Sequence, residues 1–566
     1  MITDMTKSLG KPMVAAIPKG AVLKIDMSEI LLNEQTLEFN PETFINNTGV
    51  DIKTLGTWDI VNAIKCAAYD DRIQMIYIRP DAVHGGLSQV EEIRRSLGEF
   101  RKISDKPIVS YMENPSNGGY YLASVSDKVY MTPYQGGMNT FIGISSQMTF
   151  LKDALDKLGI NVQLIRHGKY KSAGEMYIRN SSSEENMEQN KAMIQSIWNT
   201  WSEQIASSRN MTAENLTALI EGLKLNFPED FKNNGLVDEL LTKEELKAQV
   251  AKLSGKEKWS DVKLISLADY SSIMKRIDDN NKTKVAVIYA NGQIVDGKAD
   301  AEVAGERFAN MIAKIRNDES IKAVVLRVNS PGGSVLASEK IKGELDLIKG
   351  KKPLIASYGD YAASGGYWIS NNCDYIYSNA TTLTGSIGVF SMIPNVGNAV
   401  KEKLHINITP VNSCKHGDMY SLMRPLDKNE LSYMQASVEK IYDKFTSTVS
   451  MGRGVSQEYV DSIAQGRVWT GAQAKEIKLV DEIGTLDDAI NYAALASGEE
   501  DTLNNIQVVE YPAQKTTMEV LMTLLNGSNP ILDDTILENA ENAFYNWKNA
   551  QFGKVYAEMP YRFTFW

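Results

Sequence analysis

The sequence is poor in the side chains on which several enzyme classes depend. It holds three cysteines in 566 residues, and their spacing matches neither a metal motif nor a disulfide framework. It holds only four histidines, so a Ser-His-Asp triad would have to use one of these few rings. The cysteines are Cys66, Cys373 and Cys414, and the histidines are His84, His167, His405 and His416.

An excess of basic residues and long apolar runs are absent as well. The formal net charge of -11 argues against general nucleic-acid binding, because that function needs a basic face to displace counterions. No run of about 18 apolar residues occurs, so we expect no transmembrane helix. The opening MITDMTKSLGKPMVAAIPKG lacks an apolar core followed by a cleavage site, so we expect no export signal in it.

What is present is a globular composition and an internal repeat. Hydrophobic residues make up 43% and charged residues 23%, which is typical of folded chains, and the length predicts about two to four domains. HGGLSQVEEIRRSL resembles PGGSVLASEKIKGEL, with Gly85 and Gly332 lying 247 residues apart. SNGGYYLAS resembles ASGGYWIS at the same spacing, from Gly118 to Gly365. FIGIS and SIGVFS are 245 residues apart, and LVDEL and LVDEI are 243 apart.

Four landmarks in one order at nearly constant spacing predict two homologous domains of about 250 residues each. The boundary is expected at the polar stretch DDNNKTK, which gives an N-terminal repeat over 1–280 and a C-terminal repeat over 281–566. Within the second repeat, apolar β-rich runs alternate with helical patterns, which predicts an α/β fold with parallel sheets flanked by helices. The expected strands are 284–290, 321–328, 353–359 and 374–379, and the expected helices are 303–318 and 334–350. Longer helices are expected over 183–209 and 428–450.

The stretch YAASGGYWIS places Ser364 directly before two glycines. A serine at this position has two interpretations, as the polar cap of a helix or as a nucleophile. The GGSV turn of the same repeat offers backbone N–H groups at the start of a helix, where they can stabilise an oxyanion. It can equally be a phosphate cradle or a tight turn.

A nucleophilic serine needs a base within reach of its proton. None of the four histidines stands in a convincing sequence context, which leaves a lysine whose pKa is lowered by burial. The stretch RHGKYKSAGE offers Lys169 and Lys171.

Together these motifs resemble the signal peptide peptidase A family, in its long tandem-domain bacterial form. The resemblance covers nearly the whole chain through YKSAGE, LRVNSPGGSV, GDYAASGGYWIS, TLTGSIGV and GRVWTGAQAKEIKLVDEIG. It implies tandem domains of the Clp-protease and crotonase-like fold. It also implies a serine endopeptidase with a Ser/Lys dyad, which works through an acyl-enzyme and needs no cofactor and no metal.

Carried over by position, the resemblance implies Ser364 as the nucleophile and Lys171 as the general base. The backbone N–H groups of Gly333 and Gly365 would form the oxyanion hole. Ser386, in TGSIG, would orient the lysine, although it can also be read as a turn-stabilising hydroxyl.

The repeat gives the two halves of the chain different parts of this site. Asn117 stands 247 residues before Ser364, so the first repeat has an amide at the nucleophile position. A similar shift from Lys171 leads to the vicinity of Gly417 in NSCKHGDM, a segment without YKSA, which disfavours Lys415 as a base. Each repeat is therefore expected to hold half a site, and neither should be active alone.

The resemblance further implies a homotetramer that degrades hydrophobic peptides such as cleaved signal peptides. Its members are anchored in the bacterial inner membrane with the catalytic part facing the periplasm, and we expect the anchor to be missing from this sequence. Two alternatives stay open, a crotonase-type acyl-CoA enzyme that uses the same backbone donors and an inactive membrane scaffold.

Overall fold

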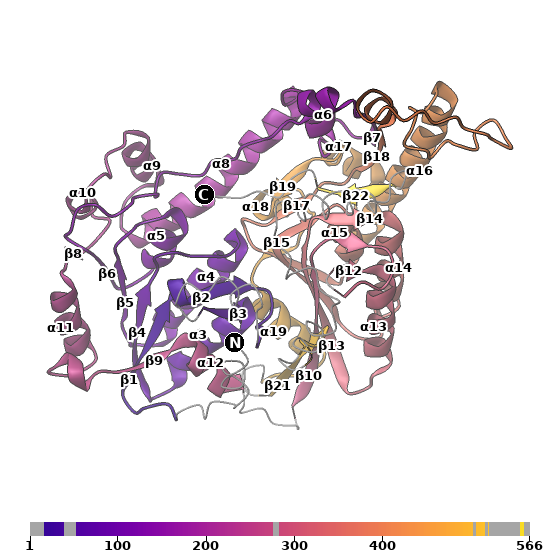
Figure 1. The fold of residues 1–566 in the computed structure, drawn as a ribbon. Helices are drawn as coiled ribbons and strands as arrows, with labels where there is room; N and C mark the ends of the chain where they lie inside the picture. Colours follow the sequence, from indigo (N-terminus) through magenta and orange to yellow (C-terminus); the bar gives the residue numbers. More distant parts are fainter. Residues whose placement is uncertain are drawn as a thin grey trace. The chain divides into compact units, whose positions relative to one another are not determined.

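The computed structural model describes residues 16–38, 52–275, 282–300, 302–501, 505–515, 519 and 555–559 (Figure 1). The chain forms two compact units. Unit 1 comprises Met1–Gly143 and Trp201–Asn280, and unit 2 comprises Ile144–Thr200 and Asn281–Trp566.

Unit 1 is built on a six-stranded sheet in the order β8-β6-β5-β4-β1-β9, with every neighbouring pair parallel. Its central strands are buried along most of their length, as expected for strands covered on both faces. The strands are β1 (Ala21–Asp26), β4 (Ile73–Arg79), β5 (Ile108–Met112), β6 (Lys128–Met131), β8 (Glu239–Leu240) and β9 (Lys263–Ser266). A second, two-stranded parallel sheet pairs β2 (Ile30–Asn33) with β3 (Lys53–Gly56).

The helices of unit 1 follow these strands. α3 (Thr57–Tyr69), α4 (Leu87–Ile103) and α12 (Leu267–Lys275) bury one face each, with Ile64 and Leu97 at 0% and 1% exposure. The others are α5 (Asn117–Ala123), α9 (Ala213–Glu221), α10 (Pro228–Asn233) and α11 (Lys243–Leu253). α8 (Glu184–Ser208) contributes its last turns to unit 1 and its first part to unit 2.

Unit 2 contains the larger sheet, in the order β19-β17-β15-β13-β10-β21, and β16 pairs with both β15 and β20. All of its pairs are parallel except β17 with β19. The strands are β10 (Thr283–Asn291), β13 (Ile321–Ser330), β15 (Leu354–Ala363), β16 (Tyr375–Ser378), β17 (Leu383–Gly385), β19 (Val468–Thr470), β20 (Glu482–Ile483) and β21 (Ile506–Tyr511).

Helices lie on both faces of this sheet (Figure 1). α19 (Leu486–Ala496) packs against β10, β13 and β15. α15 (Gly365–Ser370) also packs against β13 and β15 and contacts α14 (Val335–Asp346), which in turn contacts α13 (Gly305–Asn317). The remaining helices of unit 2 are α6 (Lys152–Leu158), α7 (Glu175–Ile178), α16 (Lys428–Arg453), α17 (Gln457–Ile463) and α18 (Gly471–Glu476).

The two units repeat one topology. The order β8-β6-β5-β4-β1-β9 in unit 1 corresponds strand by strand to β20-β16-β15-β13-β10-β21 in unit 2. The predicted fold class, tandem α/β domains with parallel sheets flanked by helices, is confirmed. The expected strands and helices are all present, with their ends shifted by a few residues.

A third sheet, in the order β12-β11-β14-β22-β18-β7, explains which segments of the chain belong to unit 2. β7 (Asn161–His167) pairs antiparallel with β18 (Val389–Asn395) along its whole length. This ladder holds residues 144–200 in unit 2, whereas the sequence assigned them to a repeat over 1–280. The other strands are β11 (Ile294–Val295), β12 (Val303–Ala304), β14 (Gly332–Ser334) and β22 (Tyr556–Glu558).

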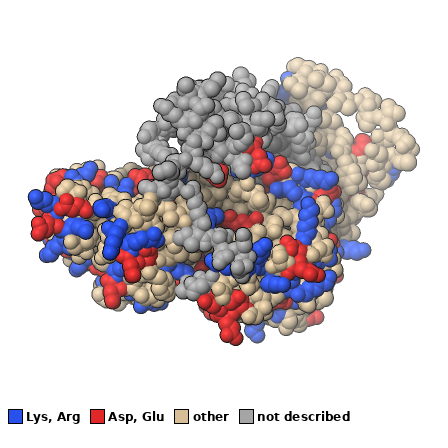
Figure 2. Space-filling view, turned by 90° about the horizontal axis from the view of Figure 1, so that it is seen from below, with Lys and Arg blue, Asp and Glu red and all other residues tan. Residues whose placement is uncertain are grey.

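Two surface properties bear on function. In the described part of the chain, no helix combines the length and the apolar character needed to cross a membrane. On the face drawn in Figure 2, acidic and basic side chains are interspersed, and no broad basic patch is visible there.

Candidate active site

Ser364 lies at the junction of β15 and α15, fully buried, with a strained backbone. Its φ of 56° and ψ of -112° fall where residues other than glycine are rare. The Ser364 N–H donates to the Gly385 carbonyl over 2.8 Å, and the Trp368 N–H donates to the Ser364 carbonyl over 2.8 Å. The side chain makes no capping hydrogen bond to α15. The helix-cap interpretation of this serine is therefore wrong, and its hydroxyl points elsewhere.

The Ser364 hydroxyl meets the amine of Lys171. Lys171 Nζ lies 2.8 Å from Ser364 Oγ, 3.1 Å from Ser386 Oγ and 3.2 Å from the Ser386 carbonyl oxygen. All three residues are 0% exposed. The structure thus brings together the three side chains that the sequence placed in one site, and all three belong to unit 2.

Burial dominates the ionisation of this lysine. Desolvation lowers the pKa of Lys171 from 10.5 to about 7, and the nearby carboxylate of Glu558 opposes the shift. The Phe390 ring, 5.9 Å from Nζ, forms part of the apolar surroundings. At neutral pH a large fraction of the amine is therefore unprotonated and able to accept a proton.

Two glycines make room for Lys171, and the sequence reasoning gave them no role. A Cβ atom at Gly466 would lie 2.5 Å from the Lys171 Cβ, and one at Gly388 would lie 3.1 Å from the Lys171 Cδ. Both glycines lie in motifs already singled out, GRVW and SIGV. The signal that could have revealed them is glycine itself, which permits close approach of a backbone to a neighbouring side chain.

An ion pair between half-buried Arg166 and buried Glu175 supports the loop that carries Lys171. Arg166 Nη1 donates to the Lys171 carbonyl over 2.7 Å and lies 3.2 Å from Glu175 Oε1. Glu175, the last residue of YKSAGE, is 0% exposed and accepts hydrogen bonds from the Ser183 hydroxyl and N–H. The Tyr170 N–H also donates to the Gln465 carbonyl over 2.9 Å. These bonds fix the backbone on both sides of the lysine.

The glycines expected to form an oxyanion hole lie beside Ser364. Gly332 and Gly333 have φ of 102° and 151°, which residues other than glycine rarely adopt. A Cβ atom at Gly365 would lie 3.1 Å from the Gly333 nitrogen, so the backbone amides of the two proposed donors are neighbours.

The other candidate bases lie away from Ser364. Lys169 is exposed, and its Nζ lies 5.1 Å from the centre of the Tyr170 ring. Lys415 is exposed in the segment between β18 and α16. The His167 ring stacks on Tyr442 at 3.8 Å.

Other chemically suggestive places lie outside this site. Among the described residues, His416, Asp427 and Glu430 approach one another closely enough to share a metal ion. Glu430 already accepts from both terminal nitrogens of Arg424 over 2.8 Å, so a cation is present there in the form of a guanidinium.

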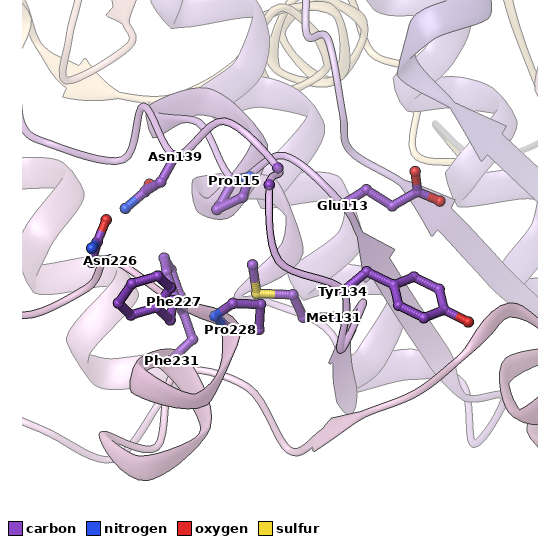
Figure 3. Close-up of a pocket in the computed structure, with 11 residues that line it drawn as sticks. Glu113, Pro115, Met131, Tyr134, Asn139, Asn226, Phe227, Pro228 and Phe231 are labelled. Atoms are coloured by element: carbon purple, nitrogen blue, oxygen red, sulfur yellow. The ribbon is translucent and has the colours of Figure 1, made fainter.

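A cavity of about 230 Å³ opens in unit 1. Figure 3 shows Met131, Phe227 and Phe231 gathered at one wall, while the Tyr134 hydroxyl points away from them. None of the residues grouped around Ser364 lines this cavity, so it contributes nothing to that site.

Comparison with known proteins agrees with a hydrolytic site. The model of Peptidase family S49 matches residues 100–257 and 346–499. "Protease 4" of Haemophilus influenzae is 35% identical over 87% of this chain and 82% of its own length. "Serine protease SPPA, chloroplastic" of Arabidopsis thaliana is 30% identical over 84% of this chain and 69% of its own. "Putative signal peptide peptidase SppA" of Enterococcus faecium is 34% identical over 41% of this chain and 68% of its own.

These matches define the class as serine protease. The chain belongs to peptidase family S49, in agreement with the resemblance seen in the sequence. Peptides are accordingly its substrates, and this assignment argues against both the acyl-CoA enzyme and the inactive scaffold.

Proposed function

We propose that the chain is a serine endopeptidase in which Ser364 and Lys171 form the catalytic dyad. The observation that carries this proposal is the 2.8 Å contact between Lys171 Nζ and Ser364 Oγ in a fully buried setting. A lysine can act as a base only when it is neutral, and burial supplies that condition here.

The hydrogen bonds around Lys171 orient its lone pair. A neutral amine has two N–H donors and one acceptor position. The Ser386 carbonyl and hydroxyl oxygens, at 3.2 and 3.1 Å, can accept from the two N–H groups, while the Ser386 hydroxyl donates to the Gly466 carbonyl over 3.4 Å. The lone pair is then left for the Ser364 O–H. Ser386 acts as a positioning residue in this scheme.

The reaction follows from this arrangement. Lys171 takes the proton of Ser364 as Oγ attacks the carbonyl carbon of the peptide, and the oxyanion accepts hydrogen bonds from the Gly333 and Gly365 N–H groups. Lys171 then gives the proton to the leaving amine as the C–N bond breaks. Water, activated by the same lysine, hydrolyses the acyl-enzyme and restores the serine.

We further propose hydrophobic peptides, such as cleaved signal peptides, as substrates, because a relative from Enterococcus faecium carries the name signal peptide peptidase. The family resemblance of the motifs supports a homotetramer attached to the bacterial inner membrane and facing the periplasm. Size determination in solution tests the tetramer, and membrane fractionation of the expressing cell tests the attachment.

Labelling by a fluorophosphonate probe tests the dyad. The probe should modify Ser364, as mapped by peptide mass spectrometry, and the label should be lost in Lys171→Ala. Lys169→Ala is the matched control and should keep the label, because Lys169 is exposed. Labelling of Lys171→Ala at the wild-type rate would remove Lys171 from the proposal.

A further inference from the structure

Gln189 lies in the first part of α8, in unit 2, and its side-chain amide reaches the segment that carries Lys171. The residue is 4% exposed. Its Nε2 donates to the Tyr170 carbonyl and to the Ser172 hydroxyl oxygen, each over 3.1 Å, while its Oε1 accepts from the Val468 N–H over 3.2 Å. Tyr170 and Ser172 directly precede and follow Lys171, and Val468 belongs to β19. One side chain therefore joins both flanks of the lysine to a strand of the large sheet.

The backbone partners fix the direction in which this amide points. The Val468 N–H can only donate and the Tyr170 carbonyl can only accept, so the oxygen of Gln189 faces the first and the nitrogen faces the second. A second N–H of the amide is left for Ser172 Oγ or Asn186 Oδ1, which both lie 3.1 Å away. Only a side chain with an acceptor and a donor at these places can make all of these bonds.

Ser172 and Asn186 connect this amide to the carboxylate of Glu175. Both are 0% exposed, Ser172 Oγ donates to Asn186 Oδ1 over 2.9 Å, and Asn186 Nδ2 donates to Glu175 Oε2 over 3.3 Å. Glu175 in turn pairs with Arg166, which donates to the Lys171 carbonyl. Such a buried network is rigid, because each lost bond would leave a buried polar group without a partner. The backbone around the lysine is thus fixed from the side of α8 as well.

The strand that the amide holds is also the strand next to the two serines of the site. β19 pairs antiparallel with β17, and Val468 lies opposite Gly385 in this ladder. The Gly385 carbonyl accepts from the Ser364 N–H over 2.8 Å, and Ser386 directly follows Gly385. A shift of the lysine segment relative to β19 would therefore change the distances from Lys171 Nζ to both serine hydroxyls.

We propose that Gln189 is a positioning residue for the reaction, which holds the backbone on both sides of Lys171 so that its amine stays within hydrogen-bond distance of Ser364. The proposal rests on the proposed dyad. Without the amide, Nζ could move away from Oγ, and water could reach a group that is now fully buried. Both changes oppose proton transfer, because the first lengthens the path of the proton and the second favours the ammonium form of the lysine.

Gln189→Leu tests this, since leucine is buried readily but offers neither donor nor acceptor. With a fluorogenic peptide, kcat should fall about 10- to 100-fold while KM stays within about twofold. The pH profile of kcat/KM, with its midpoint expected at the Lys171 pKa of about 7, should move up by about one pH unit, because water around the amine favours its charged form. The Glu558 carboxylate, which also acts on this lysine, is the same in both proteins. Gln195→Leu, at an exposed position of α8, is the matched control and should change neither quantity.

Gln189→Met is a second variant, with an unbranched and flexible side chain, and thermal melting shows whether each variant folds. A folded variant with the wild-type kcat, or with a lower kcat at an unmoved midpoint, would overturn the proposal. Loss of folded protein in both variants would overturn it too and assign Gln189 to the stability of unit 2. Failure of the dyad looks different: a fluorophosphonate label on Ser364 that forms at the wild-type rate in Lys171→Ala would overturn the dyad, and the role of Gln189 would fall with it.

Discussion

In unit 1 the turn after β5 carries Asn117, and in unit 2 the corresponding turn after β15 carries Ser364. Ser116 caps α5 in the ordinary way, with φ of -120° and its hydroxyl accepting from the Gly119 N–H over 3.0 Å. Asn117 Nδ2 donates to the Gly143 carbonyl over 2.8 Å, and the Gly143 N–H donates to Asn117 Oδ1 over 3.2 Å. The amide is thus held by backbone within unit 1, whereas Ser364 faces an amine.

The backbone angles of the two glycine pairs also differ between the units. Gly332 and Gly333 of unit 2 both have positive φ, and their counterparts Gly85 and Gly86 of unit 1 do not. Gly86 has a φ of -79°, which any residue can adopt. Positive φ angles at the glycine pair are therefore present in the repeat that carries Ser364 and absent from the glycine pair of the other. Duplication kept the sheet and helices in both units, but not these backbone angles of the glycine pair.

The largest expected effect separates the two turns directly. Ser364→Ala and Lys171→Ala should each lower kcat/KM by at least about 1,000-fold, because each removes one member of the proposed dyad. Asn117→Ala should stay within about twofold, since its amide exchanges hydrogen bonds with the Gly143 backbone of unit 1. Hydrolysis of a fluorogenic peptide measures all three variants. An equal loss in Asn117→Ala would mean that both turns serve catalysis.

Gly333→Ala should cost about 100-fold or more in kcat. A Cβ atom there would lie 1.9 Å from the Ile294 carbonyl oxygen, in a backbone with φ of 151°, so the donor N–H has to move. Gly343→Ala in α14 is the control, because nothing lies within 4 Å of its Cβ position. Comparable kcat values for the two variants would remove Gly333 from the oxyanion hole.

The pH dependence of kcat/KM should report Lys171. The active form is the neutral amine, so activity should rise about tenfold per pH unit below the pKa of about 7 and level off above it. Lys169→Ala should leave this curve in place. Steady-state kinetics between pH 5 and 9 give the curve, and a separate measurement at each pH confirms that the protein is folded. A flat profile would contradict lysine as the base.

Lys171→Met should make the protein more stable at neutral pH, by about 1–4 kcal/mol in the free energy of unfolding. The unfolded chain binds a proton below pH 10.5 that the folded chain binds only below about 7. Wild-type stability therefore rises with pH between these values, and the variant should lack that slope. Urea titrations at pH 7 and 10 measure both. Lys169→Met, at an exposed site, should change stability by less than about 0.5 kcal/mol.

The smallest effect is expected from an attempt to restore the lost nucleophile. Asn117→Ser should give no fluorophosphonate label at residue 117, because its backbone and the neighbouring glycines lack the dihedral angles found around Ser364. Peptide mapping in a Ser364→Ala background reads this out. A label at position 117 would show that a serine there is reactive without the backbone angles found around Ser364.

Local sequence patterns predicted most of the fold, and the family resemblance predicted which residues should lie together around Ser364. Apolar runs that alternate with helical patterns predicted β10, β13 and β15 to within a few residues of their ends, because buried parallel strands consist of such runs. The YKSA and ASGG motifs supplied Lys171 and Ser364 together, although composition alone had left the choice of lysine open.

The pairing partners of β7 and β22 could not be predicted. Both strands belong to the third sheet, and β7 pairs with β18, more than 200 residues further along the chain. A strand's own sequence indicates that it pairs, but not with which distant edge. For this reason the assignment of 144–200 to unit 2 and the position of Ala557 beside Gly333 emerged only from the structure.

The long β7–β18 ladder has a consequence for how the enzyme is made. Lys171 is synthesised early, but the strand that holds its segment and the Gly466 backbone packed against it are translated much later. Until the ribosome has passed Gly466, the lysine lacks the dry surroundings that lower its pKa and remains a protonated ammonium group. In the proposed dyad, Lys171 would therefore become an effective base only after most of the chain has been translated.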